Sequence, residues 1–273
     1  MVPGYAMPRL KKLQRGMSET VDAPPRKPRR PMRTQVLAAA LRKALSGGTR
    51  DEVNARAAMT TAFCGLLRAA EMALQDGEVF NPKRNLTRAD VLFCQDGVWR
   101  RYAELRAGRP VTAARVLMRP CKKLKYRPGK TVPVMLYDGA VLTPVSDLLR
   151  LFQVDGVPPD REATTPLFRM ASGAAFTTKY VREVVRFLVE AVGLDGALYG
   201  GHSLRIGGAT AALAAGLPAS VIRVMGRWDS DVFELYARAS ADGARRAGTV
   251  IASTPFEDFE GMFDHEEFVA PRR

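Results

Sequence analysis

Four residues near the end of the chain have side chains and spacings that suit chemistry at a phosphate. His202 and Arg205 are three residues apart, so on a helix both would emerge on one face, within about one turn. An arginine can bind two phosphate oxygens at once, and a histidine that titrates near neutral pH can take or relay a proton. Trp228 follows, and Tyr236 stands eight residues after it as a candidate nucleophile. These residue types could transfer a phosphodiester without a metal, because they supply a nucleophile, a stabilising cation and a proton carrier.

No motif for a metal or nucleotide cofactor accompanies these residues. The chain has no Gly-x-x-x-x-Gly-Lys-Ser/Thr loop and no paired carboxylates at metal-binding spacing. Its three cysteines, Cys64, Cys94 and Cys121, are an odd number and lack CxxC or Cys/His spacing. We expect them to be small buried side chains in a reducing compartment, and we expect a protein that uses no cofactor.

The charge of the chain favours a polyanionic partner. Lys and Arg number 42 against 28 Asp and Glu, which leaves a net charge of +14 over 273 residues. Each phosphate that such a protein neutralises releases condensed counterions, so nucleic acid is the first class to consider. Charge alone does not separate DNA from RNA or from an acidic membrane surface. The sequence has no secretory h-region, and its longest uncharged stretch, Ile206–Ile222, is too weakly apolar for a membrane span, so no membrane partner is expected.

Both ends of the chain differ in composition from the middle. Residues 1–33 carry nine basic and two acidic side chains, with prolines that block a helix, which predicts a disordered basic arm. Residues 251–273 are predicted to be a tail in which acidic side chains interleave with phenylalanines. The arm could serve as a nuclear address, which implies the nucleus in a eukaryote and the cytoplasm or nucleoid otherwise. Residues 34–250 are predicted to be the folded domain.

Hydrophobic periodicity divides residues 34–250 into helices and a small sheet. Helical spacing begins near Thr34 and is interrupted by glycine-containing turns. Shorter β-branched runs predict strands, and the last two strands predict a β-hairpin with a cationic tip. The predicted helices are residues 34–45, 51–74, 146–152, 177–192, 202–216 and 218–228, with a short one around Tyr236, and the predicted strands are residues 91–93, 98–99, 111–120 and 131–136. The pattern predicts a mainly α domain with a small antiparallel β-sheet, of the α+β class.

The C-terminal half of the chain is similar to a known family. The string runs His202-Ser203-Leu204-Arg205-Ile206-Gly207-Gly208-Ala209-Thr210, then Leu217-Pro218, Met225-Gly226-Arg227-Trp228 and Tyr236. It resembles the signature of tyrosine recombinases and phage-type integrases, and is most similar to that of the recombinases of eukaryotic mobile elements. The resemblance covers residues 34–240, and it implies the catalytic-domain fold of the DNA breaking-rejoining enzymes.

An earlier arginine fits the same family. The family has an arginine in a Gly-Leu-Arg-x-x-Glu setting, and Gly65-Leu66-Leu67-Arg68-Ala69-Ala70-Glu71 is similar, with one additional leucine. The resemblance implies that Arg68 is the first active-site arginine and that Glu71 is its structural partner. Seen alone, Arg68 would be interpreted as a surface arginine on an amphipathic helix.

The family also has a lysine on a β-hairpin, which protonates the leaving 5′ oxygen. Three lysines compete at the predicted hairpin tip: Lys122, Lys123 and Lys125. Lys125 precedes Val132 and Pro133 by seven and eight residues, a spacing often found in the family. The resemblance therefore implies Lys125 as the general acid, with Lys123 on the same strand face as the alternative. A solvated charged turn that only touches the DNA backbone would have the same composition.

The resemblance implies a two-step transesterification that needs no metal or nucleotide. Tyr236 attacks the scissile phosphate of double-stranded DNA, forms a 3′-phosphotyrosyl link and frees a 5′-hydroxyl, which then attacks another strand's link. Arg68 and Arg205 would stabilise the transition state, and His202 would assist proton transfer. Trp228 would pack under the site and offer an indole N–H to the phosphate. The family assembles four protomers on two duplexes, so self-association on DNA is expected.

A departure from the family's pattern leaves other functions open. Family members ordinarily carry a separate helical DNA-binding domain before the catalytic one, whereas only the basic arm precedes Thr34. The chain could be a fragment, could rely on the arm and other protomers for affinity, or could be a remnant of a mobile element. The alternatives are an inactive DNA-binding remnant, a type IB topoisomerase-like enzyme, and a basic RNA-binding or scaffold protein. The acidic tail could dock on a neighbouring protomer, as C-terminal segments do in this family, or on its own surface.

Overall fold

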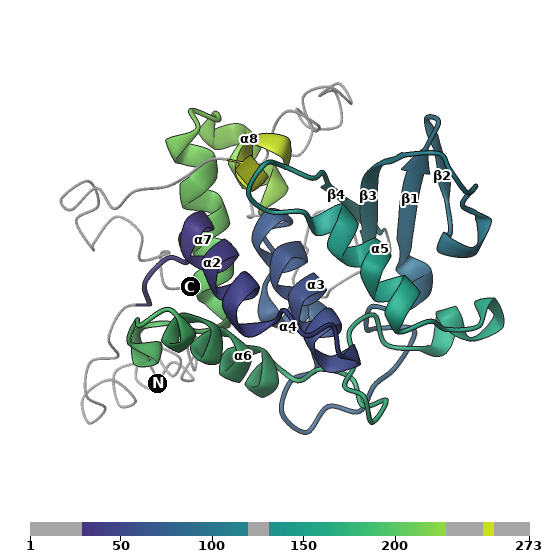
Figure 1. The fold of residues 1–273 in the computed structure, drawn as a ribbon, viewed down its shortest axis with the longest axis horizontal. Coiled ribbons are helices and arrows are strands. Elements are labelled where there is room, and N and C mark those ends of the chain that lie inside the picture. The colour runs from purple at the N-terminus through teal and green to yellow at the C-terminus, as the bar shows by residue number, and fades with distance from the viewer. Residues whose placement is uncertain (1–28, 120–130, 228–247, 254–273) are drawn as a thin grey trace, which may run out of the picture.

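Helices and one antiparallel sheet make up the structure, which is the α+β class that the sequence predicts (Figure 1). The structure is a computed structural model that describes residues 29–119, 131–227 and 248–253. The helices are α2 (Thr34–Ala44), α3 (Arg50–Cys64), α4 (Ala69–Met72), α5 (Pro144–Val154), α6 (Thr178–Ala191), α7 (Gly201–Ala214) and α8 (Ala219–Met225), with 3-10 helices η1 (Arg88–Asp90), η2 (Tyr102–Glu104), η3 (Pro159–Thr164) and η4 (Gly196–Leu198). The strands are β1 (Val91–Gln95), β2 (Val98–Arg100), β3 (Val111–Met118) and β4 (Val132–Leu136). No helix within these described ranges combines the length and the apolar character that crossing a bilayer requires.

The four strands form one sheet in the order β2-β1-β3-β4, with every pair antiparallel. Asp96 and Gly97 turn the chain between β1 and β2, and both have positive φ, as a two-residue hairpin that matches the strand twist requires. β3 pairs with β4, and Val116 stands opposite Val134, so the two strands of the predicted hairpin are confirmed. Its tip, residues 120–130, lies outside the described residues.

Helix α3 lies at the centre of the molecule. Every residue from Val53 to Cys64 except Arg56 is buried. Figure 1 shows α2, α6 and α7 on one side of α3, and α5 with the sheet on the other. A helix that is covered on nearly all sides exposes no face to water, so charged side chains are disfavoured in it. This explains why the stretch consists mainly of Ala, Thr, Met and Phe.

The single helix predicted over residues 51–74 is wrong, because the chain turns sharply in its middle. α3 ends at Cys64, and the short α4 begins only at Ala69. Between them Leu66 adopts a left-handed conformation, with φ of 49°. Leu66 and Leu67 are fully buried, so their apolar burial offsets the cost of a left-handed leucine. Helical spacing alone does not reveal this turn, since the same apolar side chains would also suit a continuous buried helix.

The folded part begins before Thr34, so the arm predicted over residues 1–33 is too long. The backbone N–H of Met32 donates to the Ser203 carbonyl on α7 at 2.9 Å, and the Met32 side chain is fully buried. A side chain at Gly207 would overlap the Met32 backbone, so the glycine permits this close approach. The part of the predicted arm before residue 29 lies outside the described residues.

The C-terminal boundary also moves. Residues 248–253 are helical, and Ile251 and Ala252 are fully buried. The Leu142 N–H donates to the Ala252 carbonyl at 2.9 Å, which ties this turn to the segment before α5. The first three residues of the tail predicted over 251–273 therefore belong to the fold, and the others lie outside the described residues.

Of the three cysteines, Cys64 is buried in the core, as expected of a small apolar side chain, and burial raises the pKa of its thiol. Cys94 is a free, partly exposed cysteine on β1. Cys121 lies outside the described residues. The burial predicted for all three is thus seen fully for one of the two described cysteines.

A buried ionic network connects the central helix with the sheet side of the molecule. Asp155, whose side chain is 0% exposed, accepts hydrogen bonds from Arg88 at 2.6 Å, from Arg169 at 2.7 Å and from Asn54 at 3.0 Å. Arg88 is fully buried too, and it lies over the Phe152 ring, 5.1 Å from the centroid. Burial opposes ionisation of Asp155, but the hydrogen bonds of Arg169 and Asn54 and the charge of Arg88 hold its pKa below the ordinary value. The network therefore joins α3, η1 and the end of α5.

Candidate active site

Arg68 immediately precedes α4 and keeps its guanidinium accessible. Its side chain is 45% exposed, and its Nη1 lies 3.1 Å from Glu71 Oε1. Its backbone N–H donates to Glu71 Oε2 at 2.7 Å, so one carboxylate holds both the backbone and the side chain of the arginine. An arginine in this arrangement is oriented without being covered, and it can bind an anion.

Helix α7 brings His202 to the same place. Its first residue, Gly201, lies against Ala69 of α4, where a Cβ on the glycine would come within 2.9 Å of the alanine Cβ. The beginnings of the two helices are therefore in close contact, and His202 lies at the surface, partly covered and near enough to Arg68 for its charge to act on the ring. The N-terminus of α7 adds partial positive charge to this part of the surface.

His202 is held in its neutral form by its surroundings. Partial burial and the positive charges of Arg205 and Arg68 lower the pKa of its imidazole below the ordinary value of 6.5. The ring is therefore uncharged at neutral pH and can accept a proton. Because both guanidinium charges act on one imidazole, Arg68, His202 and Arg205 form a single electrostatic cluster.

Arg205 belongs to this cluster but is not presented to solvent, since it is 1% exposed. Its Nη1 donates to the Leu66 carbonyl at 2.6 Å, and its Nη2 donates to the Gly226 carbonyl. Burial, with the charges of Arg68 and Arg227, lowers its pKa to about 9, so it stays protonated at neutral pH. The expected direct grip on phosphate oxygens is therefore not the geometry seen here. The guanidinium lies beneath the surface and braces the turn that follows α3.

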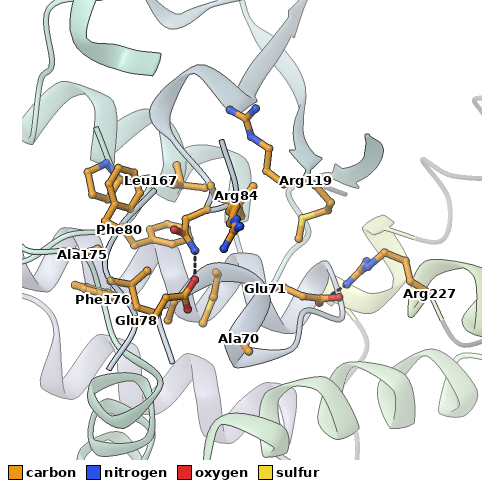
Figure 2. Close-up of a pocket in the computed structure, with 18 residues that line it drawn as sticks. Ala70, Glu71, Glu78, Phe80, Arg84, Arg119, Leu167, Ala175, Phe176 and Arg227 are labelled. Carbon is orange, nitrogen blue, oxygen red and sulfur yellow. Dashed lines mark hydrogen bonds and ion pairs between the residues drawn. The ribbon is translucent and has the colours of Figure 1, made fainter. Parts of the chain in front are cut away.

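Arg227 joins the site from the end of α8, although its sequence context does not predict this. Its Nη2 lies 2.8 Å from Glu71 Oε2, as Figure 2 shows. Its Nη1 donates to the Gly65 carbonyl at 3.2 Å, and its Nη2 donates to the Leu66 carbonyl at 3.2 Å. An arginine between Gly226 and a tryptophan is ordinarily interpreted as a surface residue. Only the pairing with a carboxylate that is distant along the chain reveals its place in the site.

Glu71 is shared between two arginines, Arg68 and Arg227. Burial opposes its ionisation, but the charge and hydrogen bond of Arg227, with the backbone N–H and charge of Arg68, hold its pKa below the ordinary value of 4.5. It is therefore a carboxylate at neutral pH, able to accept hydrogen bonds and unable to donate a proton. This state suits the structural role expected for it.

A cavity of about 430 Å³ opens beside the Glu71–Arg227 pair (Figure 2). Its lining is mainly apolar and includes Phe168 and Phe176. Figure 2 shows the Glu71–Arg227 pair at one end of the lining, with Arg84 and Arg119 as further cations. The cavity therefore borders Glu71, which pairs with Arg68, and Arg227, which pairs with Glu71.

Several predicted site residues lie outside the described residues: Lys123, Lys125, Trp228 and Tyr236. The geometry above therefore concerns Arg68, His202 and Arg205 among the predicted set. Arg119 is the last described residue before the first gap, and Arg227 is the last before the second.

The described side chains bring an exposed guanidinium, a neutral imidazole and a buried guanidinium together, with a carboxylate that orients the first. Such a set can bind an anion and accept a proton from a neighbouring group. Among the residues that the structure describes, no three His, Cys, Asp or Glu side chains gather closely enough to hold a metal ion. In comparisons with known proteins, the sequence matches no family model and no curated protein.

Proposed function

We propose that the chain is the catalytic domain of a tyrosine recombinase, which cuts and rejoins double-stranded DNA through a 3′-phosphotyrosyl link at Tyr236. The observation that carries the proposal is that Arg68 and His202, from distant segments, share one electrostatic cluster with Arg205. An accessible guanidinium beside a neutral imidazole is what tyrosine-mediated phosphodiester transfer needs. The His202-to-Tyr236 string and the α+β architecture support the fold of the DNA breaking-rejoining enzymes.

In the first step, the Tyr236 oxygen attacks phosphorus while the bond from phosphorus to the 5′ oxygen breaks. His202 takes the phenol proton, and Lys125 gives a proton to the leaving 5′ oxygen. Arg68 binds the non-bridging oxygens directly, because its guanidinium is accessible. Arg205 stabilises the developing negative charge from beneath the surface, where the low polarity of the surroundings strengthens its field.

In the second step, the 5′-hydroxyl of another strand attacks the phosphotyrosyl phosphorus and gives its proton to Lys125, while the bond from phosphorus to Tyr236 breaks and the phenol oxygen takes back the proton from His202. One phosphate ester is exchanged for another in each step, so the bond energy is retained and no nucleotide is consumed. Trp228 donates its indole N–H to the phosphate in this scheme. Double-stranded DNA as the partner, and four protomers assembled on two duplexes, are parts of the same proposal.

The test uses nicked duplexes that trap the covalent link. The wild-type protein is incubated with a pool of duplexes randomised around a nick, so that the short strand with the freed 5′-hydroxyl diffuses away. We expect an adduct that survives denaturation, that is lost in Tyr236→Phe and kept in Tyr180→Phe. In Arg68→Ala we expect its rate of formation to fall by about 100-fold or more. An adduct that persists in Tyr236→Phe would refute the assigned nucleophile.

A single observation favours a second candidate, a DNA-binding protein that no longer transfers strands. Arg205 is buried, with both terminal nitrogens donating to backbone carbonyls, and a structural role alone would account for it. Such a protein would bind duplex DNA with a steep salt dependence and would form no adduct at saturating DNA. Relaxation of a supercoiled plasmid without strand exchange would instead identify a topoisomerase-like enzyme.

A further inference from the structure

Arg227 has no part in the proposed reaction, yet it contacts several residues that hold the candidate site in place. Its side chain is 4% exposed, and its Nη2 lies 2.8 Å from Glu71 Oε2. Figure 2 shows its guanidinium directed toward Glu71 at the end of the cavity. A buried arginine needs a partner of this kind, so the pair is a built feature of the fold.

Through Glu71, Arg227 acts on Arg68. The same Oε2 that accepts from Arg227 also accepts the Arg68 backbone N–H at 2.7 Å, and Oε1 accepts from the Arg68 side chain at 3.1 Å. Without Arg227 the Glu71 carboxylate, whose side chain is only 14% exposed, would be balanced by Arg68 alone. Its orientation would then no longer be determined from both sides.

Arg227 also shares a backbone acceptor with Arg205. The Leu66 carbonyl accepts from Arg205 Nη1 at 2.6 Å and from Arg227 Nη2 at 3.2 Å. The two buried arginines therefore hold the left-handed turn between α3 and α4 together, and this turn leads directly into Arg68.

The left-handed backbone conformation of Arg227 indicates that the arginine side chain itself is needed at this position. Its φ is 55°, in the left-handed region that glycine adopts at little cost and that other residues avoid. A strained residue is retained where the surrounding structure or the function requires it. Glycine would adopt this conformation more easily, but it has no guanidinium to contact Glu71 and the turn after α3.

We propose that Arg227 is a positioning residue of the strand-transfer site, which holds Glu71 in place so that Glu71 can aim the Arg68 guanidinium at the phosphate. The proposal rests on the function proposed above. It predicts that the contribution of Arg68 to the rate of adduct formation depends on the presence of Arg227.

The chain offers variants that separate positioning from folding. Arg227→Gly keeps the left-handed backbone and removes the guanidinium, while Arg227→Lys keeps a charge without the forked donors. Arg223→Ala, at an exposed position one turn earlier on α8, is the matched control for loss of a cation. Thermal melting shows which variants remain folded.

The first measurement needs no chemistry and follows the Glu71 carboxyl by carbon NMR through a pH titration, assigned with Glu71→Gln. The charged groups around it are Arg68 immediately before its own helix, Arg227 after α8 and Arg205 on α7, with Arg84, Arg119 and Glu78 in the adjoining cavity. We expect the Glu71 midpoint to rise in Arg227→Gly and to stay unchanged in Arg223→Ala. An unchanged midpoint in a folded Arg227→Gly protein would overturn the proposal.

The second measurement is a double-mutant cycle between Arg68→Ala and Arg227→Gly. We expect Arg227→Gly to slow adduct formation at least tenfold, with partial rescue by Arg227→Lys, and Arg68→Ala to cause little further loss in that background. The rate of Arg227→Gly relative to the wild-type should rise with pH as Glu71 ionises, whereas a purely structural defect would lower this ratio equally at every pH. If the wild-type forms no adduct, the function proposed above fails, and the cycle is run on the duplex dissociation constant. Full additivity in either cycle would refute positioning by Arg227.

Discussion

Arg68 and Arg205 carry the same functional group in opposite surroundings. The Arg68 side chain is 45% exposed and pairs with Glu71, which has Arg227 as a second partner, whereas Arg205 is buried against two backbone carbonyls. An exposed ion pair contributes about 0–1 kcal/mol to stability, whereas a buried hydrogen bond to a charged group contributes about 1.5–3 kcal/mol. The first arginine is therefore free to serve a ligand, and the second also serves the fold.

This difference predicts separate outcomes for the two alanine variants. We expect Arg205→Ala to lower the free energy of unfolding by about 2–4 kcal/mol, because the Leu66 and Gly226 carbonyls lose charged donors. We expect Arg68→Ala to lower it by less than about 1 kcal/mol. Urea denaturation at neutral pH measures both. Equal midpoints for Arg205→Ala and the wild-type would contradict the buried contacts described for Arg205.

At the scale of elements, the site depends on how closely α7 approaches α3 and α4. Gly208 faces the Phe63 carbonyl and the Leu66 side chain, and a Cβ there would overlap both. The small residues of α7 thus set its distance from the turn that carries Arg68. Helical periodicity predicts α7 but does not predict this distance, because a glycine in a helix has no partner that the local sequence reveals.

The close approach predicts that Gly208→Ala is destabilising although alanine favours helices. We expect a loss of about 1–3 kcal/mol, because overpacking against backbone cannot be relieved by a side-chain rotation. Gly156→Ala is the control, since its Cβ would meet only the Phe152 carbonyl at 3.6 Å. Thermal melting or urea denaturation compares the two variants. A Gly208→Ala protein as stable as Gly156→Ala would mean that α7 lies farther from α3 than described.

At the scale of the whole molecule, the Asp155 network holds the helices and the sheet in one arrangement. Its carboxylate is surrounded by Arg88, Arg169, Asn54 and, at 3.2 Å, Arg50. None of these residues belongs to the candidate site. Asp155 pairs with all three arginines inside the fold, so this cluster supports the position of the site without taking part in its chemistry.

The network predicts a large and pH-dependent effect of Asp155→Asn. We expect a loss of about 3–5 kcal/mol at neutral pH, because Arg88 would be left buried without a negative partner. The folded pKa of Asp155 lies below its ordinary value of 3.8, so this stability is present above pH 3.8 and is lost as pH falls through the folded pKa. Urea denaturation from neutral to acidic pH measures it, with exposed Asp160→Asn as the control. A constant difference between Asp155→Asn and the wild-type down to acidic pH would contradict the assignment.

Much of the local structure was predictable, and the failures have a common cause. The helices at residues 34–45, 177–192 and 202–216 were predicted within one or two residues. The break after Cys64 was missed because the two leucines that make it are apolar in either conformation. The boundaries at both ends of the fold were missed because the contacts of Met32 and Ala252 join segments far apart in the chain.

The candidate site divides in the same way. The family resemblance drew attention to Arg68, His202 and Arg205, and the structure brings these three together. The resemblance did not reveal that Arg205 is buried, or that Arg227 shares Glu71 with Arg68. Both facts depend on which carbonyl or carboxylate a folded chain places within reach of a guanidinium.

The sequence by itself determined the α+β class, most helix and strand positions, the basic character and the residues that suit phosphate chemistry, because periodicity, turn residues and charge act locally or sum over the chain. Only the tertiary structure decided which arginine is accessible and which is buried. It also decided that Glu71 is shared between two arginines and that Asp155 pairs with three. Burial and pairing arise between segments far apart in sequence, and they change the free energy of the same side chain by more than any local preference does.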